Sequence, residues 1–203
     1  MRKLLLYIHG KGGSADEAGH YKPWCAGYDV IGLDYKSTTP WAAKDEFIQA
    51  YRRLAAGYDN VSIIANSIGA YLAMNALSDV ALEQAFFISP IVDMEKLIAD
   101  MLLWAGATED ELAQKKEITT AFGETLSWEY LCYVRAHPLD WKVPTAVLYG
   151  ENDNLTAFDT ISAFAEQHHA ALTVMPGGEH WFHTKEQMDF LDHWLLQCLK
   201  KEN

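Results

Sequence analysis

The sequence predicts an α/β fold built on a parallel sheet. Short apolar runs alternate with longer amphipathic stretches along most of its 203 residues, and this alternation is typical of strands and helices in such folds. Half of the residues are hydrophobic and 22% are charged, which is the composition of a globular chain. The length suits one domain, residues 1–203, with a smaller inserted part.

Six apolar runs are predicted as strands, and the amphipathic stretches between them as helices. The run at 61–65 is continuously apolar, so we expect it at the centre of the sheet. The predicted strands are residues 4–8, 28–35, 61–65, 84–89, 144–149 and 172–175. The predicted helices that connect or follow them are about 39–56, 68–78, 157–168 and 184–199.

Residues 91–141 interrupt the alternation. Three helices are predicted there, over 93–104, 109–116 and 128–136, with no strand between them. A strand-free stretch of this length inside an α/β alternation indicates an insertion, so we expect a small helical cap over one end of the sheet.

Ligands of parallel sheets bind beyond the carboxyl ends of the strands, so we expect the functional residues in the segments that follow the strands. The first strand is followed by residues 9–14, His-Gly-Lys-Gly-Gly-Ser. Glycines allow backbone N–H groups to approach a ligand closely. The spacing matches neither the Walker phosphate loop nor the dinucleotide motif GxGxxG, and a simple flexible turn is the alternative.

The third strand runs directly into a helix through Ala65-Asn-Ser67-Ile-Gly69. This strand–turn–helix context is typical of a nucleophile elbow, in which small residues flank a serine held on a sharp turn. Ala65 replaces the first glycine of the usual GxSxG pattern, and alanine still permits the close approach. The alternative interpretation is a serine that caps the helix.

The last two strands are followed by candidate acids and bases. Gly150-Glu-Asn-Asp153 offers a carboxylate to orient a catalytic histidine, with Glu151 and Asp153 as competitors and Asp159 further off. Gly177-Gly-Glu-His180-Trp-Phe-His183 offers an imidazole base. His180 is closer to the strand end, whereas we expect His183 near the N-terminus of the last helix, which Thr184 caps.

The order Ser67, Asp153, His180 and the motifs around these residues resemble the α/β-hydrolase superfamily, in particular its small bacterial serine hydrolases of unassigned substrate. The resemblance covers nearly the whole chain. It implies the family's core sheet without its first two strands, and a variable cap at 91–141. It also selects Asp153 over Glu151 as the acid. It places the oxyanion hole at the backbone N–H groups of Ile68 and Lys11, with the N–H of Gly12 as the alternative to that of Lys11.

The expected function is therefore a serine hydrolase of carboxylic esters that uses a Ser67–His180–Asp153 triad and needs neither cofactor nor metal. Thioester or amide hydrolysis would use the same residues. A catalytically silent binding protein on the same fold is the alternative. A metallohydrolase using Glu179, His180 and His183 is disfavoured, because two ligands on one helix face require the spacing HExxH.

Aromatic side chains give a weaker indication of the substrate pocket. We expect Gly12, Trp104, Trp128 and Trp181 to contribute to an apolar pocket of modest size. Packing of the cap onto the sheet is the alternative role for the aromatic residues of the insertion.

The net charge of −12 disfavours nucleic acid and anionic membranes as partners, since both attract clustered Lys and Arg. Three scattered cysteines fit reduced thiols, and the five-residue apolar run near the N-terminus is too short for a signal peptide. We therefore expect a cytoplasmic protein whose partner is a small-molecule ester. The sequence leaves the oligomeric state open.

Overall fold

The computed structural model describes residues 1–200, which divide into two compact units. Unit 1 comprises Met1–Val92 and the chain from Asp140 onward, and unit 2 comprises Asp93–Leu139. Unit 2 lies within the stretch 91–141, where the regular alternation of the sequence breaks.

Unit 1 contains a six-stranded sheet in which every pair of neighbouring strands is parallel, as the sequence predicts. In spatial order the strands are β2 (Tyr28–Gly32), β1 (Lys3–Ile8), β3 (Asn60–Asn66), β4 (Ala85–Ile88), β7 (Thr145–Gly150) and β8 (Ala171–Met175). The central strands are apolar on both faces because helices cover both faces. All six residues of β7 are buried, for example.

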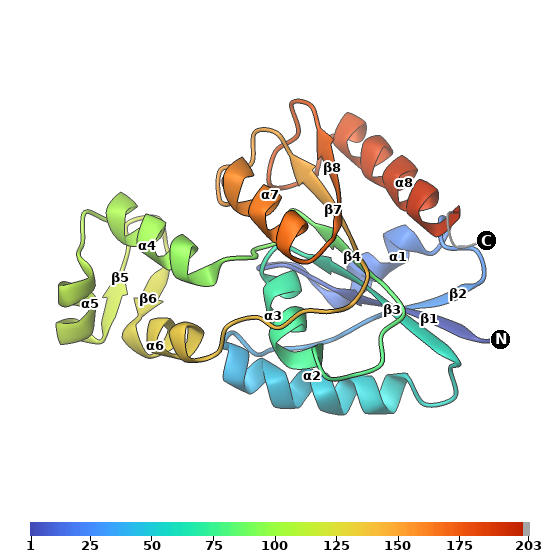
Figure 1. The fold of residues 1–203 in the computed structure, drawn as a ribbon, viewed down its shortest axis with the longest axis horizontal. Coiled ribbons are helices and arrows are strands. Elements are labelled where there is room, and N and C mark those ends of the chain that lie inside the picture. The colour runs from blue at the N-terminus through green and yellow to red at the C-terminus, as the bar shows by residue number, and fades with distance from the viewer. Residues whose placement is uncertain (201–203) are drawn as a thin grey trace. The chain divides into compact units, whose positions relative to one another are not determined.

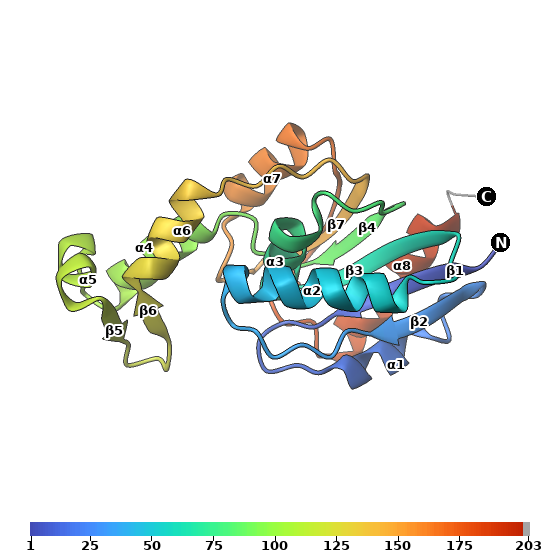
Figure 2. The ribbon, with the colours of Figure 1, turned by 90° about the horizontal axis from the view of Figure 1, so that it is seen from below.

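Helices lie on both sides of this sheet (Figures 1 and 2). Helices α1 and α8 contribute to the core on one face, where Trp194 packs edge-on against Phe86, and α2 and α3 lie on the opposite face. The helical elements of unit 1 are η1 (Ala15–Glu17), α1 (Ala18–Tyr21), α2 (Pro40–Leu54), α3 (Ile68–Leu77), α7 (Phe158–Gln167) and α8 (Lys185–Lys200). Thr184 caps α8 as expected, since its hydroxyl accepts the backbone N–H of Gln187 at 3.3 Å.

The short helices η1 and α1 were not predicted from the sequence. They contain three and four residues, which is too short for an apolar repeat of 3.6 residues to be recognised. A capping box formed by Ser14 and Glu17 begins this segment.

Unit 2 corrects the prediction of helices without a strand between them. It contains α4 (Met94–Trp104), α5 (Glu109–Lys115), β5 (Glu117–Thr119), β6 (Thr125–Ser127) and α6 (Trp128–Ala136). Strands β5 and β6 form an antiparallel hairpin in which Ile118 faces Leu126. Strands of three residues show too little alternation to be recognised in the sequence, and the turn depends on Gly123, whose φ of +89° favours glycine.

The order of the strands places a topological switch beside β1. The chain goes from β1 to β2 on one side of β1, and then crosses to β3 on the other side. The segments that follow β1 and β3 therefore separate at the carboxyl edge of the sheet, where open α/β sheets bind ligands. No helix within residues 1–200 has the length and apolarity to cross a lipid bilayer.

Candidate active site

Ser67 lies on a strained turn between β3 and α3. Its φ of +51° and ψ of −122° fall in a region that residues other than glycine rarely adopt. The turn is held by the Ser67 N–H, which donates to Ile88 O at 3.0 Å, and by the Ser67 carbonyl, which accepts the N–H of Ile91 at 3.2 Å. This geometry is that of a nucleophile elbow, in which the serine hydroxyl stands clear at the sheet edge.

Close backbone packing explains the small residues around Ser67. A Cβ on Gly69 would lie 2.3 Å from the carbonyl oxygen of His9, so only glycine lets α3 start so close to β1. A Cβ on Gly10 would approach the Cβ of Ser67 to 3.3 Å. Ala65, the departure from GxSxG, is fully buried within β3.

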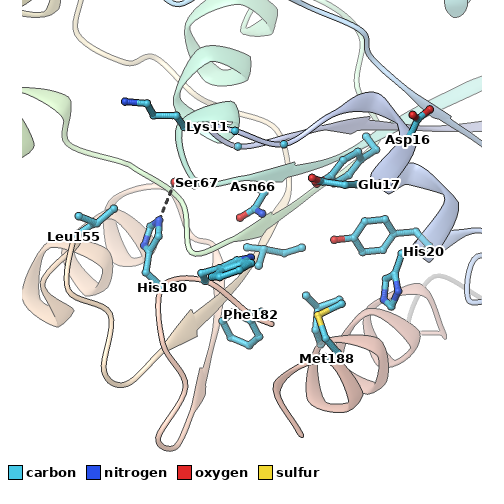
Figure 3. A pocket seen from close by; sticks show the side chains of 18 residues that line it. Lys11, Asp16, Glu17, His20, Asn66, Ser67, Leu155, His180, Phe182 and Met188 are labelled. Atoms are coloured by element: carbon cyan, nitrogen blue, oxygen red, sulfur yellow. Dashed lines mark hydrogen bonds between the residues drawn. The ribbon is translucent and has the colours of Figure 1, made fainter. Parts of the chain in front are cut away.

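His180 reaches Ser67 from the loop between β8 and α8. Its Nε2 lies 2.8 Å from Ser67 Oγ, and Figure 3 shows this hydrogen bond at one end of a cavity. Gly177, with a φ of +68°, turns the chain after β8, and the buried ring of Phe182 anchors the loop in the core.

Asp153 binds the other nitrogen of His180. Its Oδ2 lies 2.7 Å from His180 Nδ1, and its side chain is fully inaccessible to solvent. Its Oδ1 accepts the backbone N–H groups of Leu155 at 2.8 Å and Thr156 at 2.9 Å. Because a carboxylate can only accept hydrogen bonds, Nδ1 of His180 carries the proton, and Nε2 is free to accept the Ser67 hydroxyl proton.

The competing residues of the same loops lie elsewhere. Glu151 is exposed and accepts the backbone N–H of Gly177 at 2.8 Å. The Nδ1 of His183 lies 2.8 Å from the carbonyl oxygen of Trp181, on which its ring also stacks. Asp159 is exposed in the first turn of α7. None of the three has a hydrogen bond with Ser67 or His180.

The acid loop and the histidine loop are packed tightly against each other. The Asn152 N–H donates to Gly178 O at 2.7 Å. A Cβ on Gly150 would lie 2.5 Å from the carbonyl oxygen of Glu179, so glycine at this position permits the contact. These backbone contacts hold Asp153 and His180 in register.

The glycine loop after β1 lies beside Ser67. The Gly13 N–H donates to Gly10 O at 3.2 Å, which closes a tight turn with Lys11 and Gly12 at its centre. Gly12 has a φ of +76°, as the third position of a type II turn requires. Ile68 is the first residue of α3, where backbone N–H groups have no partner within the helix.

A cavity of about 790 Å³ extends from Ser67 and His180 along unit 1. Gly12 and Trp181 line it, and Trp181 is 69% exposed. Trp104 and Trp128 belong to unit 2, at the end of α4 and the start of α6, so their contribution to a pocket stays a prediction.

Sequence reasoning missed the polar residues of this cavity. Tyr7, Asp16, Glu17, Tyr21 and Asn66 all line it. Tyr7 falls within the predicted buried strand 4–8, and Tyr21 falls in no predicted element. Both rings are buried, so only the folded cavity reveals that these residues line the site. Burial, the neighbouring phenol of Tyr21 and the Glu17 carboxylate raise the pKa of Tyr7 well above its ordinary value, so this hydroxyl stays a donor at neutral pH. In the sequence, the adjacency of Asn66 to Ser67 is the feature that could have indicated that Asn66 lines the cavity.

Within residues 1–200, no cluster of three or more His, Cys, Asp or Glu side chains is arranged to hold a metal ion. His180 uses both ring nitrogens in contacts with Ser67 and Asp153.

A family model for alpha/beta hydrolases of unknown function (DUF900) matches residues 16–135, which is more than half of the chain. The chain belongs to this family. The matched range includes Ser67 and ends before Asp153 and His180, so the family assignment rests on the first part of the fold.

Solved structures agree with this fold. Alpha/beta hydrolase domain-containing protein 10 from mouse is 15% identical, with a TM-score of 0.78 over 98% of this chain and 90% of the other. Est1E from Butyrivibrio proteoclasticus is 16% identical, with a TM-score of 0.75 over 98% and 88%. An esterase from Pyrococcus furiosus is 18% identical, with a TM-score of 0.65 over 98% and 82%. No curated protein matches the sequence significantly.

Proposed function

We propose that this chain is a serine hydrolase that cleaves carboxylic esters through an acyl-enzyme intermediate. The observation that carries the proposal is the continuous hydrogen-bond chain from Ser67 Oγ through His180 to the buried carboxylate of Asp153. A nucleophile, a base within hydrogen-bond reach and a group that orients the base are the parts that nucleophilic catalysis requires.

In the first half-reaction, Ser67 Oγ attacks the ester carbonyl carbon while His180 Nε2 accepts the hydroxyl proton. Asp153 holds the imidazole in the tautomer that can accept this proton, and its charge stabilises the imidazolium. When the tetrahedral intermediate collapses, the carbon–oxygen bond to the alcohol breaks and His180 returns the proton to the departing alkoxide. The products are the free alcohol and an ester of the acyl group with Ser67.

The negative charge that develops on the carbonyl oxygen needs hydrogen-bond donors. We assign this role to the backbone N–H groups of Ile68 and Lys11. The Ile68 N–H lies in the first turn of α3, where the helix dipole favours negative charge. Lys11 lies in the tight turn that packs beside Ser67 through Gly10. Each such donor contributes about 3–4 kcal/mol to the stabilisation of a transition state.

In the second half-reaction, a water molecule replaces the alcohol. His180 Nε2 removes a proton from the water as its oxygen attacks the acyl carbon, and the same proton returns to Ser67 Oγ when the acid departs. A thioester or an amide would follow the same steps, so substrate assays decide the leaving group.

The test compares wild-type protein with Ser67→Ala in hydrolysis of p-nitrophenyl acetate and in labelling by a fluorophosphonate probe. We expect the variant to lose at least about 10³-fold in kcat and all labelling, since a triad acts as a unit, while its circular dichroism spectrum stays unchanged. Activity of Ser67→Ala close to wild type would refute the mechanism. A folded wild type that neither reacts with the probe nor turns over any ester would favour a catalytically silent binding protein.

A further inference from the structure

The cavity beside Ser67 has an acidic end. Figure 3 shows Ser67 and His180 on one side, Asp16 and Glu17 on the other, and Asn66 between them in this view. Asp16 and Glu17 are exposed, and neither has an ion pair with a cation among residues 1–200. Two unneutralised carboxylates on one wall give this end of the cavity a negative potential.

The carboxylate of Glu17 is held in place by groups of the protein. Its Oε2 accepts the Tyr7 hydroxyl at 2.5 Å, and its Oε1 accepts the backbone N–H of Ser14 at 3.2 Å. The second contact belongs to the capping box of η1, which is the purely structural role of this residue. Each carboxylate oxygen accepts about two hydrogen bonds, so both oxygens keep capacity for a ligand, and the position of the charge is fixed before any ligand arrives.

A second feature of the same wall is independent of the carboxylates. Tyr21 lines the cavity and is only 5% exposed, and within residues 1–200 its hydroxyl has no hydrogen-bond partner. Buried hydroxyls are normally satisfied. Because Tyr21 lines the cavity and its hydroxyl is not among the buried side-chain atoms without a partner, a group bound in the cavity can pair with this hydroxyl. Its ring packs 5.1 Å from that of Tyr7, next to Glu17.

The cations around the cavity do not neutralise this wall. The side chain of Lys11 extends away from Glu17 in Figure 3. The Nε2 of His20 lies 2.7 Å from Asp192 Oδ1, so the Asp192 carboxylate, and not Asp16 or Glu17, would pair with a protonated His20 imidazole. Asp16 has no comparable partner among the described residues.

Part of the cavity lining is apolar. It comprises Ile88, Phe182, Met188 and Leu191, and all except Met188 are buried. Figure 3 shows Phe182 and Met188 across the cavity from Asp16 and Glu17. An apolar chain is therefore favoured along this part of the lining, and a hydrogen-bonding cation at the end where Glu17 and Tyr21 present oxygen acceptors.

We propose that this cavity selects esters whose acyl group carries an ammonium ion at the end remote from the ester carbonyl. The inference rests on the proposed function, because it assumes that Ser67 attacks the carbonyl. An ammonium has three N–H donors and no acceptor, which suits the Glu17 carboxylate and the Tyr21 hydroxyl. A carboxylate at the same end of the acyl group would be repelled.

The test uses three p-nitrophenyl esters of similar length: 6-aminohexanoate, heptanoate as its neutral isostere, and the monoester of adipic acid as its anionic counterpart. For the wild type we expect kcat/KM about tenfold higher for the aminohexanoate than for the heptanoate, and lowest for the adipate. Glu17→Gln keeps an acceptor for Tyr7 and Ser14 but removes the charge. The ratio of kcat/KM for the aminohexanoate to that for the heptanoate should therefore fall about tenfold, because KM for the aminohexanoate rises. Asp16→Asn should lower it less.

Asp45→Asn is the matched control. Asp45 is exposed on α2, does not line the cavity and gives the same change of net charge, so the ratio should not move. A wild-type ratio at or below one, or a ratio that Glu17→Gln leaves unchanged, would overturn the inference. Ser67-dependent cleavage of heptanoate without any gain for the ammonium ester would overturn it while leaving the proposed function intact.

A binding measurement keeps the inference testable if no ester turns over. Calorimetry with 6-aminohexanamide and heptanamide on wild type and Glu17→Gln should show tighter binding of the cationic amide to the wild type alone. Equal binding of the two amides to the wild type would refute the acidic selectivity whatever the catalytic outcome.

Discussion

The substitution Asp153→Asn tests how the triad works, because the structure dictates how an asparagine must sit there. The Oδ1 position faces two backbone N–H donors, from Leu155 and Thr156, at 2.8 and 2.9 Å. An amide NH₂ cannot occupy that position without opposing donors, so the amide oxygen must take it. The NH₂ group then faces His180 Nδ1, at the place where Oδ2 now lies 2.7 Å away.

This arrangement imposes the wrong tautomer on His180. With a donor opposite Nδ1, that nitrogen must become the acceptor, and the ring proton moves to Nε2. A protonated Nε2 cannot accept the proton of Ser67, which lies 2.8 Å away. We therefore expect kcat to fall by about 10⁴-fold, which corresponds to about 5 kcal/mol of lost transition-state stabilisation.

The assay is steady-state hydrolysis of p-nitrophenyl acetate, with Glu151→Gln as the matched control. Glu151 lies in the same loop, and among residues 1–200 its side chain accepts only the Gly177 N–H. A glutamine can also accept this N–H, so kcat of Glu151→Gln should stay within about threefold of wild type. A kcat of Asp153→Asn within tenfold of wild type, or a larger loss in Glu151→Gln, would refute the tautomer argument and reassign the acid.

Two further predictions concern packing and thiol chemistry. Gly69→Ala should lower the melting temperature by several degrees, because its Cβ would lie 2.3 Å from the His9 carbonyl oxygen and overpacking costs about 1–3 kcal/mol. Gly19→Ala, where a Cβ meets nothing within 4 Å, is the control, and equal melting temperatures of the two variants would contradict the argument. Burial raises the pKa of the Cys25 thiol to about 12, so iodoacetamide at pH 8 should modify the exposed Cys132 and spare Cys25 in the folded protein, as peptide mass spectrometry can show. Alkylation of both at equal rates would count against the buried, protonated thiol.

The local elements of the fold could be predicted from the sequence because their causes are local. A continuous apolar run predicts a strand covered on both faces, and the strand–turn–helix pattern around Ser67 predicts an elbow from small residues on either side. The hairpin of β5 and β6 and the short helix α1 escaped prediction, since three or four residues carry too little periodicity.

The tertiary structure decided which side chains meet. In the sequence, Glu151 competes with Asp153 as the acid and His183 with His180 as the base. The resemblance to α/β hydrolases selects Asp153, and nearness to the strand end favours His180. The backbone path of the two packed loops turns Asp153 and His180 toward Ser67, and ties Glu151 to a backbone N–H instead.

The acidic end of the cavity likewise emerged only in three dimensions. Glu17 lies 50 residues before Ser67 in the sequence, and the Ser14-x-x-Glu17 pattern around it indicates only a helix cap. It lines the same cavity because β1 lies beside β3, and this pairing brings the segment after β1 to the edge where β3 ends. Sequence periodicity reports which face of an element is buried, whereas the pairing of distant strands sets which polar groups share a cavity, and that depends on the fold as a whole.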